Sequence, residues 1–193
     1  MITEMKKIPI TEESRPFATA LKVCPLETLG YVEEEFFQTG TANVYREGEG
    51  APVAEIADAP YTTRLLVRRP RDPEKFSGNV VIEILNASAM MDIDRIWVNT
   101  WRYFTRHGDI YIGITSKGHV VDALKGCDPA RYAAINWANP APERVPSEAV
   151  RSSRFGFLPQ YEQGLFWDML IDLAKLLRTD SPLNPIAGFG RAW

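Results

Sequence analysis

The sequence predicts an α/β fold, and the alternation of two kinds of segment indicates it. Residues 80–85 and 109–115 are short, nearly continuous apolar runs, which are typical of strands buried on both faces. Between them, Trp97, Trp101 and Phe104 follow the spacing of one helix face. A strand, a helix and a second strand in close succession form a βαβ unit. The two strands should therefore be parallel, with a right-handed crossover.

The part of the chain before this unit predicts an irregular start followed by a strand pair. Residues 1–30 are expected to be irregular because prolines interrupt any regular element, and residues 31–193 to form the domain. Residues 31–45 are rich in aromatic and β-branched side chains, which favour a strand. Residues 61–70 are a second strand candidate, which ends at a proline. We expect the two to pair antiparallel at one end of the sheet.

Two helices and one long excursion complete the expected elements. The first helix should begin near Asp94 and end at Gly108, because glycine readily takes the left-handed conformation found at helix ends. Residues 164–178 predict a second helix. Its apolar stripe, expected to be core, consists of Phe166, Met169, Leu170, Leu173 and Leu177. Residues 116–159, rich in turn-forming side chains, predict a mostly irregular excursion with a helical turn at 120–125.

Composition and charge exclude several classes of protein. With 22 basic and 25 acidic residues of mixed order, the chain has no basic footprint for nucleic acid and no polybasic segment for a membrane. No apolar run reaches the length of about 20 residues that spans a bilayer, and the start is no signal peptide. Cys24 and Cys127 match neither a metal spacing nor a disulfide framework. We expect a cytoplasmic protein without a metal or a cofactor.

Four segments resemble an alpha/beta hydrolase domain. They are VVIEILNAS (80–88), DIDRIWVNTWRYFTRHGDIYIGITSK (92–117), DPARYAAINWANP (128–140) and GLFWDMLIDLAKLLR (164–178). The resemblance implies a mostly parallel sheet with helices on both faces, of which residues 31–193 would hold the first four core strands. It also implies a serine hydrolase that cleaves a small carboxylic ester, with a serine nucleophile and a histidine base.

The catalytic triad that this resemblance implies does not fit into the 193 residues. The family places the nucleophile in a G-x-S-x-G turn after the fifth strand, followed by the acid and then the histidine. The sequence lacks this motif, and His107 and His119 come too early. The serines without its flanking glycines are Ser14, Ser77, Ser88, Ser116, Ser147, Ser152, Ser153 and Ser181. We expect a chain that ends before the nucleophile strand and is inactive alone.

Two groups of residues are candidates for a site at the carboxyl ends of the strands. The oxyanion-loop candidates, which follow the third core strand, are Asn86, Ala87 and Ser88. A polar turn is the alternative, and the sequence leaves open which N–H would donate. The possible substrate-pocket residues are Lys117, His119, Tyr132, Trp137 and Asn139. For these five residues the alternatives are a solvated loop and a small aromatic cluster beneath a loop.

Three other features favour structural roles. Asp92 and Asp94, at the start of the first helix, are expected to cap it and to interact with its dipole instead of binding a metal. His107 lies at the end of that helix, where a positive charge is favoured. Residues 188–190 (GFG) precede an expected strand instead of following one, which is the wrong geometry for a dinucleotide.

Two further functions stay open besides that of a hydrolase. The chain could be a non-catalytic binding module that keeps the sheet and the pocket. It could also be a structural half that assembles with a separate C-terminal half. In the isolated chain, residues 80–85 are expected to form a bare sheet edge, because the missing fifth strand would cover the other side of this strand. A short apolar edge of this kind predicts self-association.

Overall fold

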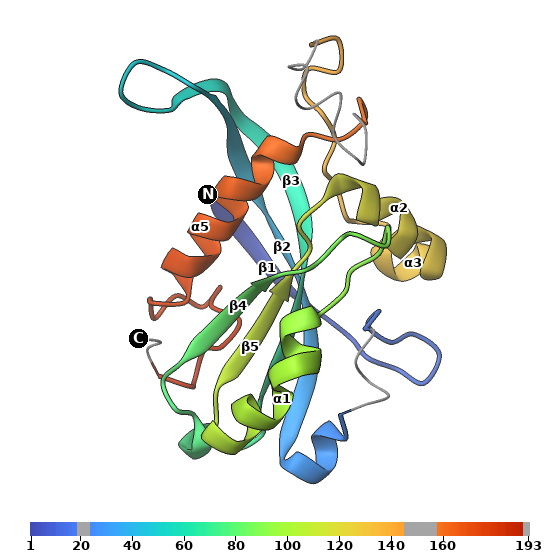
Figure 1. Ribbon diagram of the computed structural model, residues 1–193, viewed down its shortest axis with the longest axis vertical. Helices are drawn as coiled ribbons and strands as arrows, with labels where there is room; N and C mark the ends of the chain where they lie inside the picture. Colours follow the sequence, from blue (N-terminus) through green and yellow to red (C-terminus); the bar gives the residue numbers. More distant parts are fainter. Residues whose placement is uncertain (19–23, 145–157, 191–193) are drawn as a thin grey trace.

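The computed structural model describes residues 1–18, 24–144 and 158–190, and its centre is a five-stranded sheet of order β1-β2-β3-β5-β4 (Figure 1). The strands are β1 (Ile2–Ile8), β2 (Tyr31–Arg46), β3 (Val53–Pro70), β4 (Val80–Ile84) and β5 (Ile110–Ile114). The α-helices are α1 (Arg95–His107), α2 (Gly118–Cys127), α3 (Pro129–Tyr132) and α5 (Phe166–Leu176). The short 3-10 helices are η1 (Leu26–Leu29), η2 (Pro73–Lys75) and η3 (Gln163–Leu165).

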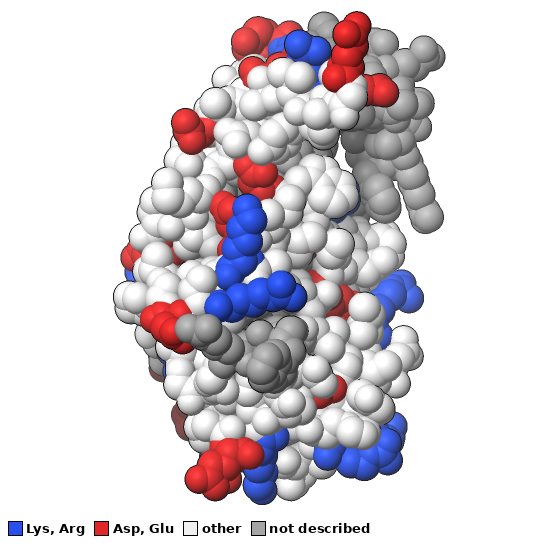
Figure 2. All heavy atoms as spheres, turned by 90° about the vertical axis from the view of Figure 1, so that its left-hand side faces the viewer, with Lys and Arg blue, Asp and Glu red and all other residues white. Residues whose placement is uncertain are grey.

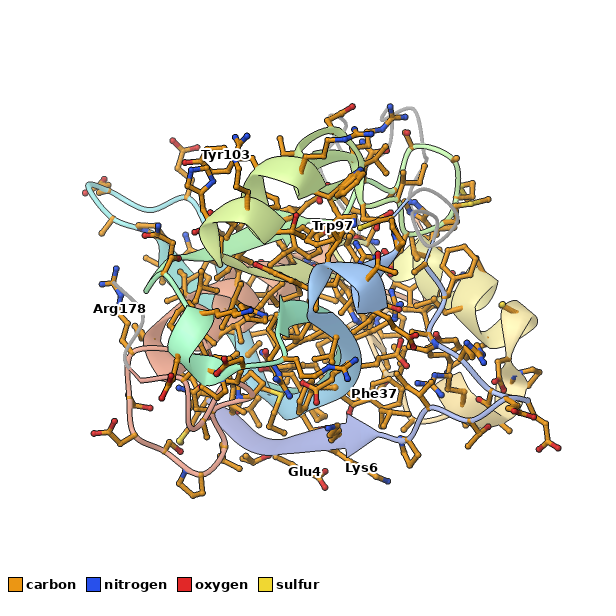
Figure 3. The ribbon with its side chains drawn as sticks, turned by 90° about the horizontal axis from the view of Figure 1, so that it is seen from below. Glu4, Lys6, Phe37, Trp97, Tyr103 and Arg178 are labelled. Atoms are coloured by element: carbon orange, nitrogen blue, oxygen red, sulfur yellow. The ribbon has the colours of Figure 1, made fainter. Side chains whose placement is uncertain are left out.

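Helices α1 and α5 lie on opposite faces of the sheet. Side chains of directly paired residues share a face, so Arg68 lies on the same face as Tyr111, its partner on β5. Trp97 of α1 packs against Tyr111, which places α1 on this face. Figure 3 shows Trp97 directed from α1 into the molecule and Tyr103 directed away from it. Gln38 of β2 lies on the other face and donates a hydrogen bond to the Met169 carbonyl of α5.

The expectation of a mostly parallel sheet is wrong for the described strands. Strands β1, β2 and β3 are antiparallel to one another, and β3 is antiparallel to β5. Among the described residues, only β4 and β5 pair in parallel. The reason is that the long β2–β3 hairpin dominates this part of the chain, while the sequence holds a single βαβ unit. The expected antiparallel pair and the expected parallel pair are both present.

One strand of the sheet lies in a segment that the sequence predicts to be irregular, and another strand begins earlier than predicted. Residues 1–30 are not irregular throughout, because β1 pairs with β2 along the sheet edge. The sequence does not predict β1, because its charged residues do not alternate with apolar ones as in a half-buried strand. Of its side chains, only Ile8 is buried. Strand β3 begins at Val53 instead of residue 61. There it pairs with β2 alone, so Pro60 removes no hydrogen bond from a second neighbour.

The two long helices form as their apolar spacing predicts. Helix α1 begins after Asp94 and ends at Gly108, whose φ of 83° is left-handed. On α5, the side chains of Phe166, Met169 and Leu173 are buried. The stripe is therefore core, as expected.

The excursion after β5 is more helical than its composition predicts. Helix α2 extends from Gly118 to Cys127, and its side chains of Val120, Val121 and Leu124 are buried in the main core. Asp128 then accepts a hydrogen bond from the Arg131 N–H and begins α3. Tertiary burial of the apolar side chains overrides the turn-rich composition. Residues 145–157 of the expected excursion lie outside the described residues.

Charges of both signs are distributed over the surface without a dominant sign on the visible face. Figure 2 shows the side of the molecule that carries α5, where basic and acidic side chains are scattered over a mostly uncharged surface. Within the described ranges, no helix has the length and apolar character needed to cross a membrane.

Candidate active site

Among the three oxyanion-loop candidates after β4, one has a backbone N–H that is not used within the described residues. Asn86 forms a two-way backbone bridge with Ile93, with N–H to O distances of 2.9 and 3.0 Å. The Ser88 N–H donates to the Asn86 side-chain oxygen at 3.0 Å. The Ala87 N–H donates to no acceptor in the described part of the chain. Of the three oxyanion-loop candidates, Ala87 is therefore the one whose N–H has no acceptor among the described residues.

Two buried ion pairs anchor the far end of this loop to β3. Asp92 accepts hydrogen bonds from Arg64 at 3.1 Å and from the Thr115 hydroxyl at 2.6 Å. Asp94 pairs with Arg68 at 2.5 Å. Both guanidinium groups are fully buried, and each also pairs with a glutamate of β2, so removing either aspartate would take one of two carboxylate partners from a buried charge. These contacts fix the position of the loop relative to the sheet.

Asp94 occupies the expected N-cap position of α1, but the expectation of a capping hydrogen bond from its side chain is wrong. Glu83 of β4 caps the helix instead, since its carboxylate accepts from the N–H groups of Ile96 at 2.9 Å and Trp97 at 3.2 Å. The carboxylates of Asp92 and Asp94 instead form ion pairs with Arg64 and Arg68 of β3. Burial raises the pKa of Asp92, and the neighbouring Arg64 only partly opposes this effect.

The loop after β5 and the first turn of α2 contact the loop after β4. A ring nitrogen of His119, Nε2, lies 3.3 Å from the Ala87 carbonyl oxygen, and the side chain is buried. The Ser116 hydroxyl donates to the Leu85 carbonyl at 2.7 Å. Lys117, in contrast, has an exposed side chain at the N-cap position of α2. The structure thus brings His119, but not the head of Lys117, to the oxyanion-loop candidates.

The other three expected pocket residues lie apart from this point. The buried Tyr132 hydroxyl donates to Glu35 at 3.1 Å and accepts from the Phe17 N–H at 2.7 Å. Trp137 is fully buried and stacks on Phe166, with ring centroids 6.3 Å apart. Asn139 donates to the Pro159 carbonyl and holds a surface loop together. Their role as pocket residues stays a prediction.

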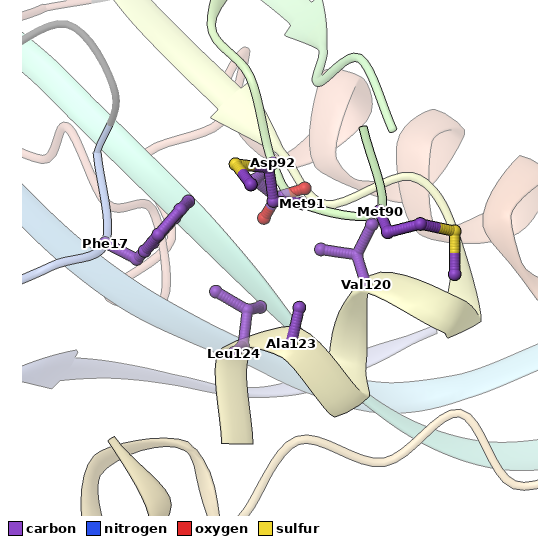
Figure 4. Close-up of a pocket in the computed structure, with 7 residues that line it drawn as sticks. All are labelled: Phe17, Met90, Met91, Asp92, Val120, Ala123 and Leu124. Atoms are coloured by element: carbon purple, nitrogen blue, oxygen red, sulfur yellow. The ribbon is translucent and has the colours of Figure 1, made fainter. Parts of the chain in front are cut away.

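A cavity lies beside the second half of the loop after β4, and the sequence did not predict it. It has a volume of about 140 Å³ and lies between the β4–α1 loop and α2 (Figure 4). Its lining consists of Phe17, Met90, Met91, Asp92, Val120, Ala123 and Leu124. The available signal was the Met-Met-Asp sequence at residues 90–92, which follows residues 86–88 after Ala89. The sequence around Asp92 is typical of a helix start, and two methionines in a loop are no signal of a cavity by themselves.

The described serines engage groups other than a histidine. The hydroxyls of Ser14 and Ser77 donate to carboxylates, of Asp128 and Asp109. The Ser88 hydroxyl donates to the Asn86 side chain. The Ser181 hydroxyl accepts from a backbone N–H. Ser147, Ser152 and Ser153 lie outside the described residues. In the described parts of the chain, no group of three His, Cys, Asp or Glu side chains is placed to hold a metal ion.

The fold and this loop define the class of protein. A sheet with helices on both faces carries a hydrogen-bond donor in the loop after a parallel strand, as in hydrolases of the α/β type. The family model described as alpha/beta hydrolase domain matches residues 4–191, so the chain belongs to this family. Searches of curated proteins and of solved structures found no match to the chain.

Proposed function

We propose that this chain supplies the oxyanion loop of a serine hydrolase that acts on small carboxylic esters. The supporting observation is the N–H of Ala87, which has no acceptor among the described residues and lies on a loop anchored by buried ion pairs at the carboxyl end of β4. A donor held in this way can stabilise the negative oxygen of a tetrahedral intermediate, typically by about 2.7–4 kcal/mol. The two cysteines are free, which supports a cytoplasmic location.

The 193 residues alone are proposed to lack ester hydrolysis. The sequence has no G-x-S-x-G turn, and the hydroxyls of Ser14, Ser77 and Ser88 are bonded to other side chains. A serine-directed phosphonate probe should therefore leave the chain unlabelled. Stoichiometric labelling of one serine, abolished by changing that serine to alanine, would contradict the proposal.

The role of Ala87 is tested in an active hydrolase that contains this chain. This can be the chain extended by any downstream coding sequence, or the chain combined with a separate C-terminal half. Ala87→Pro removes the free N–H, and kcat should fall by about 100- to 1000-fold, with a smaller change in KM. Ser88→Pro is the matched control, because the Ser88 N–H is already bonded to Asn86. Unchanged turnover in both variants, with folding intact, would show that the loop is only a turn.

One observation favours the second candidate function, a structural half that assembles with another chain. Strand β4 pairs with β5 on one side, and no described residue pairs with its other side. A strand from a C-terminal half is one proposed occupant of this edge, and a second copy of the chain is the other. Activity that appears only on mixing two inactive halves would support assembly. A binding module would stay inactive in every combination.

A further inference from the structure

The cavity next to the β4–α1 loop has the size of a small organic ligand. Its volume is about 140 Å³, and a cavity of about 150 Å³ with an apolar lining can hold benzene. The side chains of Val120 and Leu124 come from α2, and those of Met90 and Met91 from the loop. Figure 4 shows them surrounding the space together with Phe17. Methionine side chains adapt to ligands of different shapes.

One polar group, the Asp92 carboxylate, interrupts this apolar lining. Its side chain is only 2% exposed. Oxygen Oδ2 accepts from Arg64 and Thr115, whereas Oδ1 has no hydrogen-bond partner among the described residues. A buried acceptor without a partner is unfavourable, because it has lost its hydrogen bonds to water. A ligand that donates a hydrogen bond to Oδ1 would remove this deficit.

The charges around Asp92 indicate that the donor is neutral. Arg64 pairs with both Asp92 and Glu35, and Arg131 pairs with Glu35. Two guanidinium groups therefore face two carboxylates, and the network has no net charge. A ligand hydroxyl would keep this balance. A ligand ammonium would place an unbalanced positive charge beside the apolar side chains, where its loss of hydration is costly.

We propose that this cavity binds a small apolar alcohol, whose hydroxyl donates a hydrogen bond to Asp92 Oδ1 while its hydrocarbon part packs against Met90, Val120 and Leu124. Binding of this kind requires no catalytic step. The inference therefore stands independently of the proposed hydrolase activity.

Three ring compounds of similar size test the proposal on the full chain. The chain is labelled with ¹³C at the methionine methyl groups and titrated with cyclohexanol, cyclohexanone or cyclohexylammonium. Cyclohexanol should shift the Met90 and Met91 signals to saturation, while the signal of Met169, a core residue of α5 outside the cavity, stays in place. Cyclohexanone and cyclohexylammonium should bind roughly tenfold more weakly, because the first lacks a donor and the second brings a charge.

Several outcomes would overturn the proposal. The absence of saturable shifts with cyclohexanol would exclude the site. Tighter binding of cyclohexanone would mean that Asp92 itself carries a proton and donates it. Tighter binding of cyclohexylammonium would refute the charge argument.

Two variants test the contacts separately. In Asp92→Asn, the amide oxygen should keep the hydrogen bonds from Arg64 and Thr115, so that the NH₂ group turns toward the cavity. The preference should then invert, with cyclohexanone binding more tightly than cyclohexanol. An unchanged preference would contradict the role of Oδ1.

The second variant leaves the ion pairs intact and fills the cavity. Ala123 lies on the exposed part of the lining, so Ala123→Phe should block cyclohexanol without unfolding the chain. Ala174→Phe is the matched control, because Ala174 is an exposed helical alanine of α5 outside the cavity. Binding that survives in Ala123→Phe would place the ligand elsewhere.

Discussion

The two edges of the sheet differ in how well they are protected from another chain. Strand β1, at one edge, has the sequence ITEMKKI, and Figure 3 shows Glu4 and Lys6 directed outward from it. Strand β4, at the other edge, has the sequence VVIEI. Its single charge belongs to Glu83, which is buried against the start of α1. Charged side chains hinder edge-to-edge pairing, so only the β4 edge is suited to accept a further strand.

The backbone of β4 supports the same distinction. In a parallel pair, alternate residues of a strand direct their N–H and C=O groups to the neighbour. The Asn79 carbonyl and the Leu85 N–H bond to β5, so the odd-numbered residues face β5. Val80, Ile82 and Ile84 must then direct their backbone groups to the open side. The Ile84 side chain is also 49% exposed, which adds apolar surface to this edge.

The largest expected effect is on association of the isolated chain through β4. The chain should self-associate, and Ile84→Lys should raise the dissociation constant about tenfold or more, since an ammonium buried without a partner costs well over ~1.4 kcal/mol. Light scattering coupled to size exclusion would measure the change in mass. Lys6→Glu, on the charged β1 edge, is the control and should leave the mass unchanged. A native chain that stays monomeric at high concentration would refute the inference that the β4 edge accepts a further strand.

A second prediction concerns hydrogen exchange along β4. At low protein concentration, the amides of Val80, Ile82 and Ile84 should exchange at least about tenfold faster than those of Val81 and Glu83, because only the latter are bonded to β5. At high concentration, pairing of the β4 edges should protect the three outward amides. Uniform protection of all five amides at every concentration would mean that another part of the chain covers this edge.

The edge position of β4 could be predicted from the sequence, whereas the identity of the opposite edge could not. The apolar run at residues 80–85 and the βαβ pattern are local signals, and the structure confirms both. Strand β1 carries charges that cannot be distinguished from those of a solvated segment, and its pairing with β2 is tertiary. The expectation of a mostly parallel sheet came from the family resemblance. The residues themselves predicted one antiparallel and one parallel pair.

The same limit applies to the candidate site. The position of residues 86–88 after a buried strand was sufficient to place the loop at the carboxyl end of the sheet. The burial of Arg64 and Arg68 was not predictable from the strand that contains them, because arginine in a strand usually indicates a solvated face. Their partners Asp92 and Asp94 come from a distant loop, and the sequence around them is typical of a helix start.

The smallest expected effect concerns the ion pair that ties β1 to β2. Lys7 pairs with Glu34 at 2.5 Å, but the Lys7 side chain is 60% exposed. Solvent therefore screens the pair, and Lys7→Ala should lower the free energy of unfolding by no more than about 1 kcal/mol at neutral pH. Lys6→Ala is the matched control. Lys6 is exposed on the same strand and has no ion pair among the described residues, so its loss should have no effect.

The effect of Lys7→Ala should also depend on pH. Burial raises the pKa of Glu34, but hydrogen bonds from Arg69 and Lys7 outweigh burial, and the pKa is lowered in the folded chain. A lowered folded-state pKa contributes stability that is present above the unfolded pKa and is lost as the pH falls through the folded pKa. Urea unfolding should therefore separate Lys7→Ala from the native chain at neutral pH and not in acid, where Glu34 is protonated. A difference that persists in acid would show that the Lys7 side chain stabilises β1 by packing instead of by charge.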